Sequence, residues 1–181
     1  MSVIVSGCIL MACNSSSNNN QDSVDSAQNV NDSTNVVTDN TSDFATEAAS
    51  GGMMEVQLGN IAMTNGTAPS VKQFGQDMVA DHTKANDELK AMAASKNISL
   101  PAVPNSDMQK KIDDLQQKHG SDFDKAYIDL MVDDHKEDID HFQKEADKGN
   151  DTSIKGWASG KILILQHHLQ MARDIQSNLK K

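Results

Sequence analysis

The chain has 181 residues, enough for one domain of ordinary size with extensions, and a net charge of -10 at pH 7. Such a charge argues against nucleic acid as a partner, because phosphates would repel the protein, and against adsorption to anionic lipid through a basic face. Only 3% of the residues are aromatic and three are Pro, which favours an all-α protein over a sheet protein. Both cysteines, Cys8 and Cys13, precede the part that we expect to fold, so that part has neither disulfides nor a thiolate metal site.

Residues 1–12 predict a lipoprotein signal peptide. Their apolar run is far shorter than the roughly 20 residues that span a bilayer, and it is typical of a secretion signal. The adjoining word Leu10-Met11-Ala12-Cys13 resembles the bacterial lipobox, in which a peptidase cuts before a lipidated Cys. No Lys or Arg precedes the apolar run, which leaves the natural start of the chain open.

We therefore expect Cys13 to become the mature N-terminus and to carry acyl chains, which anchor a protein without spanning the bilayer. The alternative is a buried N-terminal strand or helix. The expected location is the bacterial cell envelope, with the domain in the periplasm or at the outer membrane. The membrane is then a partner through the lipid anchor, and a protein partner is not readable from the sequence.

Residues 13–42 predict a disordered tether. After Cys13 the segment is rich in Asn, Ser, Asp and Thr with isolated Val, and it has no Lys, Arg, Leu, Ile, Phe or Met. Such a composition buries too little apolar surface to offset the entropy of ordering the chain. We expect the tether to join the membrane to a folded domain at residues 43–181.

Four long amphipathic helices and one short helix are predicted in that domain, because apolar residues recur there at spacings of three and four. Ser121 is the expected N-cap of the third long helix, and Gly51-Gly52 in the first either kinks that helix or permits close packing. The predicted ranges are 43–66, 70–96, 106–118 (the short helix), 121–149 and 152–181.

The link between the second and third long helices is long enough to run the length of a bundle. It contains Pro101 and Pro104, which end the preceding helix, and the short helix. We therefore predict a ferritin-like four-helix bundle in which the helices run up, down, down and up, with a long middle crossover that carries the short helix.

One word occurs twice, as Met78-Val-Ala-Asp81-His82 and as Met131-Val-Asp-Asp134-His135. Each copy lies mid-helix, and its His falls on the apolar stripe. Glu55 in the first helix and His168 in the fourth lie near the same level, because at 1.5 Å per residue the four positions differ by about 5 Å in height.

These four residues predict a polar cluster at the axis of the bundle. It is either a hydrogen-bonded network that fixes the register of the helices, or a site for a single Zn, Cu or Fe ion with Glu55, His82, His135 and His168 as ligands. A third possibility is that the four do not converge. Asp81 and Asp134 are candidates for outer acceptors of His hydrogen bonds or for solvated carboxylates.

The words around Glu55, His82, His135 and His168, in this order, resemble the exported bacterial family known as domain of unknown function 4142. That resemblance covers the folded domain and implies a ferritin-like fold without an established activity. Ferritin-like di-iron proteins bind their metal through Glu residues and Glu-x-x-His motifs. This pattern is incomplete here, because Val79 and Leu165 stand where the bridging Glu residues are expected. We expect a non-enzymatic envelope protein with a structural, interaction or stress-related role, with a periplasmic metal-binding protein as the alternative and a redox enzyme as the least favoured.

Overall fold

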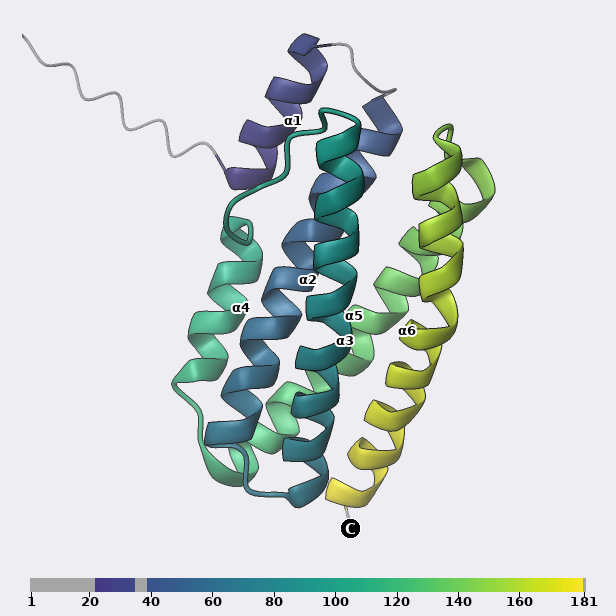
Figure 1. The fold of residues 1–181 in the computed structure, drawn as a ribbon. Helices are drawn as coiled ribbons and strands as arrows, with labels where there is room; N and C mark the ends of the chain where they lie inside the picture. The colour runs from purple at the N-terminus through teal and green to yellow at the C-terminus, as the bar shows by residue number, and fades with distance from the viewer. Residues whose placement is uncertain (1–21, 35–38, 181) are drawn as a thin grey trace, which may run out of the picture.

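The computed structural model describes residues 22–34 and 39–180. In these ranges the protein is all-α, as predicted, with six helices and no strand (Figure 1). The predicted signal peptide, Cys13 and residues 35–38 lie outside the described residues. None of the described helices combines the length and the apolar character needed to cross a membrane.

Four helices of 27 to 29 residues make up most of the molecule, and two shorter helices lie beside them. At 1.5 Å per residue, each long helix is about 40 Å long. The helices are α1 (Ser23–Thr34), α2 (Asp39–Asn65), α3 (Pro69–Ser95), α4 (Ser106–Gln116), α5 (Gly120–Lys148) and α6 (Thr152–Leu179).

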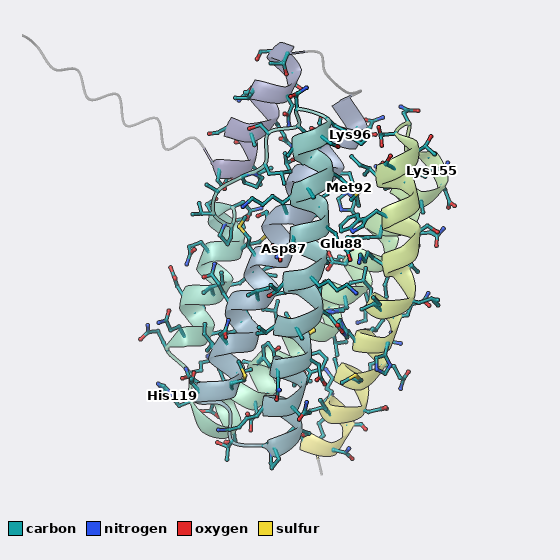
Figure 2. The ribbon with its side chains drawn as sticks, viewed as in Figure 1. Asp87, Glu88, Met92, Lys96, His119 and Lys155 are labelled. Atoms are coloured by element: carbon teal, nitrogen blue, oxygen red, sulfur yellow. The ribbon has the colours of Figure 1, made fainter. Side chains whose placement is uncertain are left out.

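The long helices form two antiparallel hairpins. In Figure 1, α2 runs down and α3 returns up, while α5 runs up and α6 returns down. The chain passes from α3 to α5 through α4, which descends beside α2, so α3 and α5 point the same way. Polar contacts join the hairpins where α3 faces α6: Lys96 donates to Asp151 at 2.7 Å, and Glu88, labelled in Figure 2, accepts from Trp157 at 3.0 Å and also from Lys161.

Two apolar clusters fill the interior, one towards each end of the long helices. The cluster at the end where α2 meets α3 includes Met54, Leu58, Phe74, Met78, Phe123, Tyr127 and Met131. The cluster at the opposite end includes Phe44, Leu89, Ile98, Phe142, Ile154 and Leu165. The buried polar residues described below belong to neither cluster and lie between them.

Close contact between α2 and α3 depends on glycine. A Cβ on Gly75 would lie 2.8 Å from the carbonyl oxygen of Gly59 and 2.8 Å from Cβ of Ala62. Gly52 makes room for a side chain of α3, since the amide group of Asn86 fills the space that a Cβ would need. The close packing that Gly51-Gly52 suggested is therefore present at Gly52.

The predicted disorder of the whole tether is wrong, because Ser23–Thr34 form α1 and α2 begins at Asp39 rather than at residue 43. Polar bonds to the loop between α3 and α4 hold α1 in place. Asn31 both donates to the carbonyl of Ser99 at 3.0 Å and accepts from its N–H at 2.7 Å. Composition alone did not predict this helix. Its buried apolar side chains are only Val24 and Ala27, and hydrogen bonds to the α3–α4 loop hold it in place.

The expected N-cap of α5 is also wrong. The helix starts at Gly120, where φ is +63° and favours glycine, so Ser121 lies inside the first turn. Asp124 stands 3% exposed and accepts from the N–H groups of Thr67 and Ala68 at 2.9 and 2.8 Å. Asp124 therefore joins the α2–α3 turn to α5, and its negative charge also stabilises the positive N-terminal end of α5.

Candidate metal centre

The structure brings all four predicted core residues together at mid-height. Glu55 comes from α2, His82 from α3, His135 from α5 and His168 from α6. The centroids of the three imidazole rings form a nearly equilateral triangle with sides of 5.8, 5.4 and 5.5 Å. One nitrogen of each ring lies within 4.8 Å of a nitrogen of each other ring.

The neighbouring turns of the four helices explain why the rings are buried. Met78 and Met131 each stand one turn before a His of the repeated word and are fully buried. His135 and His168 are 0% and 1% exposed, and His82 is 7% exposed. The triangle is therefore enclosed on the side of the cluster that contains Phe74 and Tyr127.

Each histidine has one ring nitrogen in contact with an acceptor. Nδ1 of His82 lies 2.6 Å from Oε2 of Glu55, Nδ1 of His135 lies 3.0 Å from the carbonyl oxygen of Met131, and Nε2 of His168 lies 2.9 Å from Oδ2 of Asp81. Such an acceptor fixes the orientation of an imidazole and selects which nitrogen carries the proton.

The other nitrogen of each histidine has no hydrogen-bond partner. Among the described residues, five buried side-chain atoms lack a partner, and four of them belong to this cluster. They are Nε2 of His82, Nε2 of His135, Nδ1 of His168 and Oε1 of Glu55; the fifth is the hydroxyl of Tyr127. Unpartnered polar atoms are costly in a protein interior, so their gathering at one place needs a physical reason.

Burial keeps the histidines neutral. It lowers the pKa of His82 to about 4, and it lowers the pKa of His135 well below the ordinary value, with the nearby rings of His82 and His168 adding to the effect. The pKa of His168 falls for the same reasons, burial and then His82. Neutral imidazole is the form that binds a metal ion.

Glu55 acts on His82 from outside the triangle of rings. Its Oε2 is held at Nδ1 of His82, and the two nitrogens of an imidazole point in divergent directions. A metal ion on Nε2 of His82 would therefore lie on the far side of the ring from this carboxyl group. In this geometry Glu55 positions a ligand rather than serving as one, although its Oε1 lies 3.7 Å from Nε2 of His135.

The two predicted outer acceptors differ. Asp81 holds His168, as expected of an outer acceptor. Asp134 is 7% exposed and forms an ion pair with Lys111 of α4, at 3.8 Å. Oxygens of Glu55 and Asp134 and a nitrogen of His135 lie within 4.8 Å of one another, which makes a second, overlapping group of potential ligands. Burial raises the pKa of Asp134 to about 6.

Sequence reasoning missed the contact between His135 and the carbonyl of Met131. A residue four positions earlier on a helix is always near, but the sequence does not show whether a ring turns towards that carbonyl. It also missed Lys111, which approaches Asp134 only because α4 packs along the bundle.

Fold and site together define a helical-bundle protein with a buried cluster of three histidines and their outer acceptors. The chain belongs to the family described as "Domain of unknown function (DUF4142)", whose match covers residues 26–175. The match includes all four cluster residues and most of α1. No curated protein and no solved structure matches the chain.

Proposed function

We propose that this protein binds a single divalent transition-metal ion through His82, His135 and His168. One observation carries the proposal: each of the three rings is fixed by an acceptor at one nitrogen and has its other nitrogen buried without a hydrogen-bond partner, and one nitrogen of each ring lies within 4.8 Å of a nitrogen of both other rings. Acceptor, imidazole and metal in line is the usual arrangement of histidine ligands.

The donor set favours zinc or copper over iron. Three neutral imidazoles suit Zn and Cu, whereas non-haem iron sites normally include a bound carboxylate. Here Glu55 and Asp81 hold the outer nitrogens of His82 and His168. The carboxylate of Asp81 would increase the basicity of His168 and offset part of the charge of the ion.

A purely structural histidine network is the alternative, and the unpartnered atoms count against it. A network that fixes the register of helices gains stability only when its buried groups are satisfied. In this cluster three ring nitrogens and one carboxyl oxygen have no hydrogen-bond partner.

The setting of this metal site is part of the proposal. The order and direction of the four long helices support a ferritin-like bundle with α4 in its crossover. The lipobox at Cys13 supports a lipid anchor in the cell envelope. The protein would then present a bundle-core metal ion on the periplasmic side or at the outer membrane.

The metal content of the purified protein tests directly whether the three histidines bind an ion. The full chain is equilibrated with Zn, Cu or Fe, dialysed and analysed by mass spectrometry, beside the double variant His82→Gln/His135→Gln. A second double variant, His119→Ala/His167→Ala, removes two exposed histidines as a matched control. Circular dichroism verifies that each variant keeps its helices.

We expect about one Zn or Cu per chain in the parent and in the control, and none in the double variant of the site. Metal should also raise the melting temperature of the parent, because a ligand that binds only the folded state stabilises it. A parent that retains no metal, or a site variant that retains it, would refute the proposal.

A further inference from the structure

We infer that the bound metal ion keeps one coordination position open to a small cavity lined by α2, α3, α5 and α6, and that this position takes a small molecule or anion of two or three atoms. The inference rests on the proposed three-histidine site. It concerns what that site binds in addition to the metal.

The number of ligands is the first step. Zn and Cu normally have at least four ligands, and sites with three protein ligands leave a position for water or a substrate. In this cluster Oε2 of Glu55 is held by His82, and Oδ2 of Asp81 is held by His168. Three imidazole nitrogens remain, so the protein itself supplies one ligand fewer than a closed site needs.

The packing on one side of the triangle excludes a further ligand there. Phe74 meets the ring of His168 edge-on at 6.3 Å between centroids, and Met78, Tyr127 and Met131 are all 0% exposed. This side is filled by the apolar cluster at the α2–α3 end of the bundle. A molecule from solvent cannot reach the ion through it.

A cavity lies on the other side. It has a volume of about 40 Å³, and Glu55 and His82 line it together with residues of the adjacent turns of all four long helices. Its apolar lining includes Ala48, Ala85, Phe142, Trp157 and Leu165. Asp81, Lys161 and Ile164, which are partly or well exposed, lie where the cavity meets solvent between α3 and α6.

The size of the cavity sets the class of ligand. About 10–15 Å³ accommodates one water molecule, so about 40 Å³ holds a few atoms and excludes a metabolite of ordinary size. Oε1 of Glu55 has no hydrogen-bond partner and belongs to a residue that lines the cavity. A ligand bound end-on to the metal can exchange a hydrogen bond with this oxygen, which favours small protonated molecules such as water or peroxide and small anions of similar shape.

Azide tests the inference in the copper-loaded full chain. Azide bound to Cu(II) gives an intense charge-transfer absorption, so a titration reports both stoichiometry and affinity. We expect one azide per copper. Ala85→Phe, which fills the cavity, should raise the dissociation constant of azide at least about tenfold, with copper content unchanged.

Two further variants distinguish a blocked cavity from general damage to the fold or to copper binding. Ala94→Phe introduces the same ring on an exposed position of α3 and should leave azide binding unchanged. Ile164→Trp, at the 39% exposed rim, covers the opening without entering the interior, and should slow azide association at least about fivefold even if Ala85→Phe loses copper.

The outcomes distinguish the two proposals. Stoichiometric copper without an azide absorption overturns the open position and leaves the metal site standing. Azide binding that neither Ala85→Phe nor Ile164→Trp alters overturns the route through this cavity. A parent chain that binds no copper overturns both.

Discussion

At the scale of single residues, the cluster is arranged before any ion arrives. The three histidines reach their acceptors from three different helices, and each acceptor is of another kind: a buried carboxyl, a backbone carbonyl and a half-exposed carboxylate. Burial raises the pKa of Glu55 well above its ordinary value, and the nearby charge of Asp134 adds to this.

The contact between Asp81 and His168 gives a prediction at this scale. Asp81→Ala should weaken copper or zinc binding by about 10- to 100-fold, because His168 loses the acceptor that orients it and makes it more basic. A competition titration with a chelator of known affinity measures the change. Asp77→Ala, one turn earlier on α3, removes the same charge away from the histidines and should leave the affinity within about twofold. Equal losses in both variants would mean that general electrostatics, and not the contact with His168, sets the affinity.

The spacing of residues predicted which side chains meet, but not how each is used. The helical periodicity of the apolar residues and the rise per residue predicted one level for Glu55, His82, His135 and His168, and the structure brings the four side chains together. The two copies of the repeated word nevertheless differ: Nδ1 of His135 meets the carbonyl of Met131, whereas Nδ1 of His82 meets Glu55. This difference depends on what the neighbouring helices offer, which no local pattern encodes.

At the scale of helices, the approach of α2 to α3 sets the height at which Glu55 meets His82. Gly59 and Gly75 face each other across this contact, and the absence of side chains lets the two backbones come together. Because α2 and α3 are joined by the short turn that Asp124 holds, their register is fixed at one end by that turn and, six residues into each helix from that turn, by the glycines.

Two glycine substitutions should have opposite effects. Gly75→Ala places a methyl group 2.8 Å from Gly59 O and Ala62 Cβ, so it should destabilise the metal-free protein by about 1–3 kcal/mol. Gly156→Ala on α6 meets nothing within 4 Å and should stabilise the protein by about 0.5–1 kcal/mol, because Ala loses less entropy in a helix. Urea unfolding measures both. A neutral Gly75→Ala would show that the α2–α3 contact adjusts freely.

Helices with an apolar stripe were predictable, and the one without it was not. The four long helices and α4 begin and end within a few residues of the predicted ranges, since their burial follows the periodic pattern. In α1 the buried side chains are Val24, Ala27 and Asn31, and Asn31 is held by Ser99, which lies 68 residues away in the chain. Such a partner is visible only once the crossover loop has its position in space.

At the scale of the whole molecule, the site lies where two packed halves meet. Each end of the bundle has its own apolar cluster, and the layer between them contains the three histidines and Glu55. The ion would bind residues from both hairpins: α3 contributes His82, and α5 and α6 contribute His135 and His168. Metal binding would therefore join the hairpins at mid-height, in addition to the contacts that Glu88 and Lys96 make across the α3–α6 boundary nearer the C-terminal end of α3.

The order in α1 changes how the anchor and the domain are connected. With Cys13 lipidated, only residues 14–21 separate the acyl chains from Asp22, which accepts from the N–H of Ser106 at 2.7 Å. Whatever their conformation, these residues can span at most about 30 Å, because an extended chain advances about 3.3–3.6 Å per residue. The bundle would thus be confined to the membrane surface rather than extended from it by a tether of about thirty residues.

Lipid labelling in a bacterial host tests this arrangement. Cys13→Ser should abolish both the incorporation of a fatty-acid analogue and the recovery of the protein in the membrane fraction, because the acylated thiol is lost. Cys8→Ser changes the other cysteine and leaves the lipobox at Cys13 unchanged, so it should leave both readouts intact. Inserting a Gly/Ser segment of about 20 residues after Cys13 should make the domain more accessible to a bulky protease-sized probe without changing the fraction bound to the membrane. Labelling that persists in Cys13→Ser and disappears in Cys8→Ser would move the anchor to Cys8, and labelling that persists in both would refute thiol lipidation as the means of attachment.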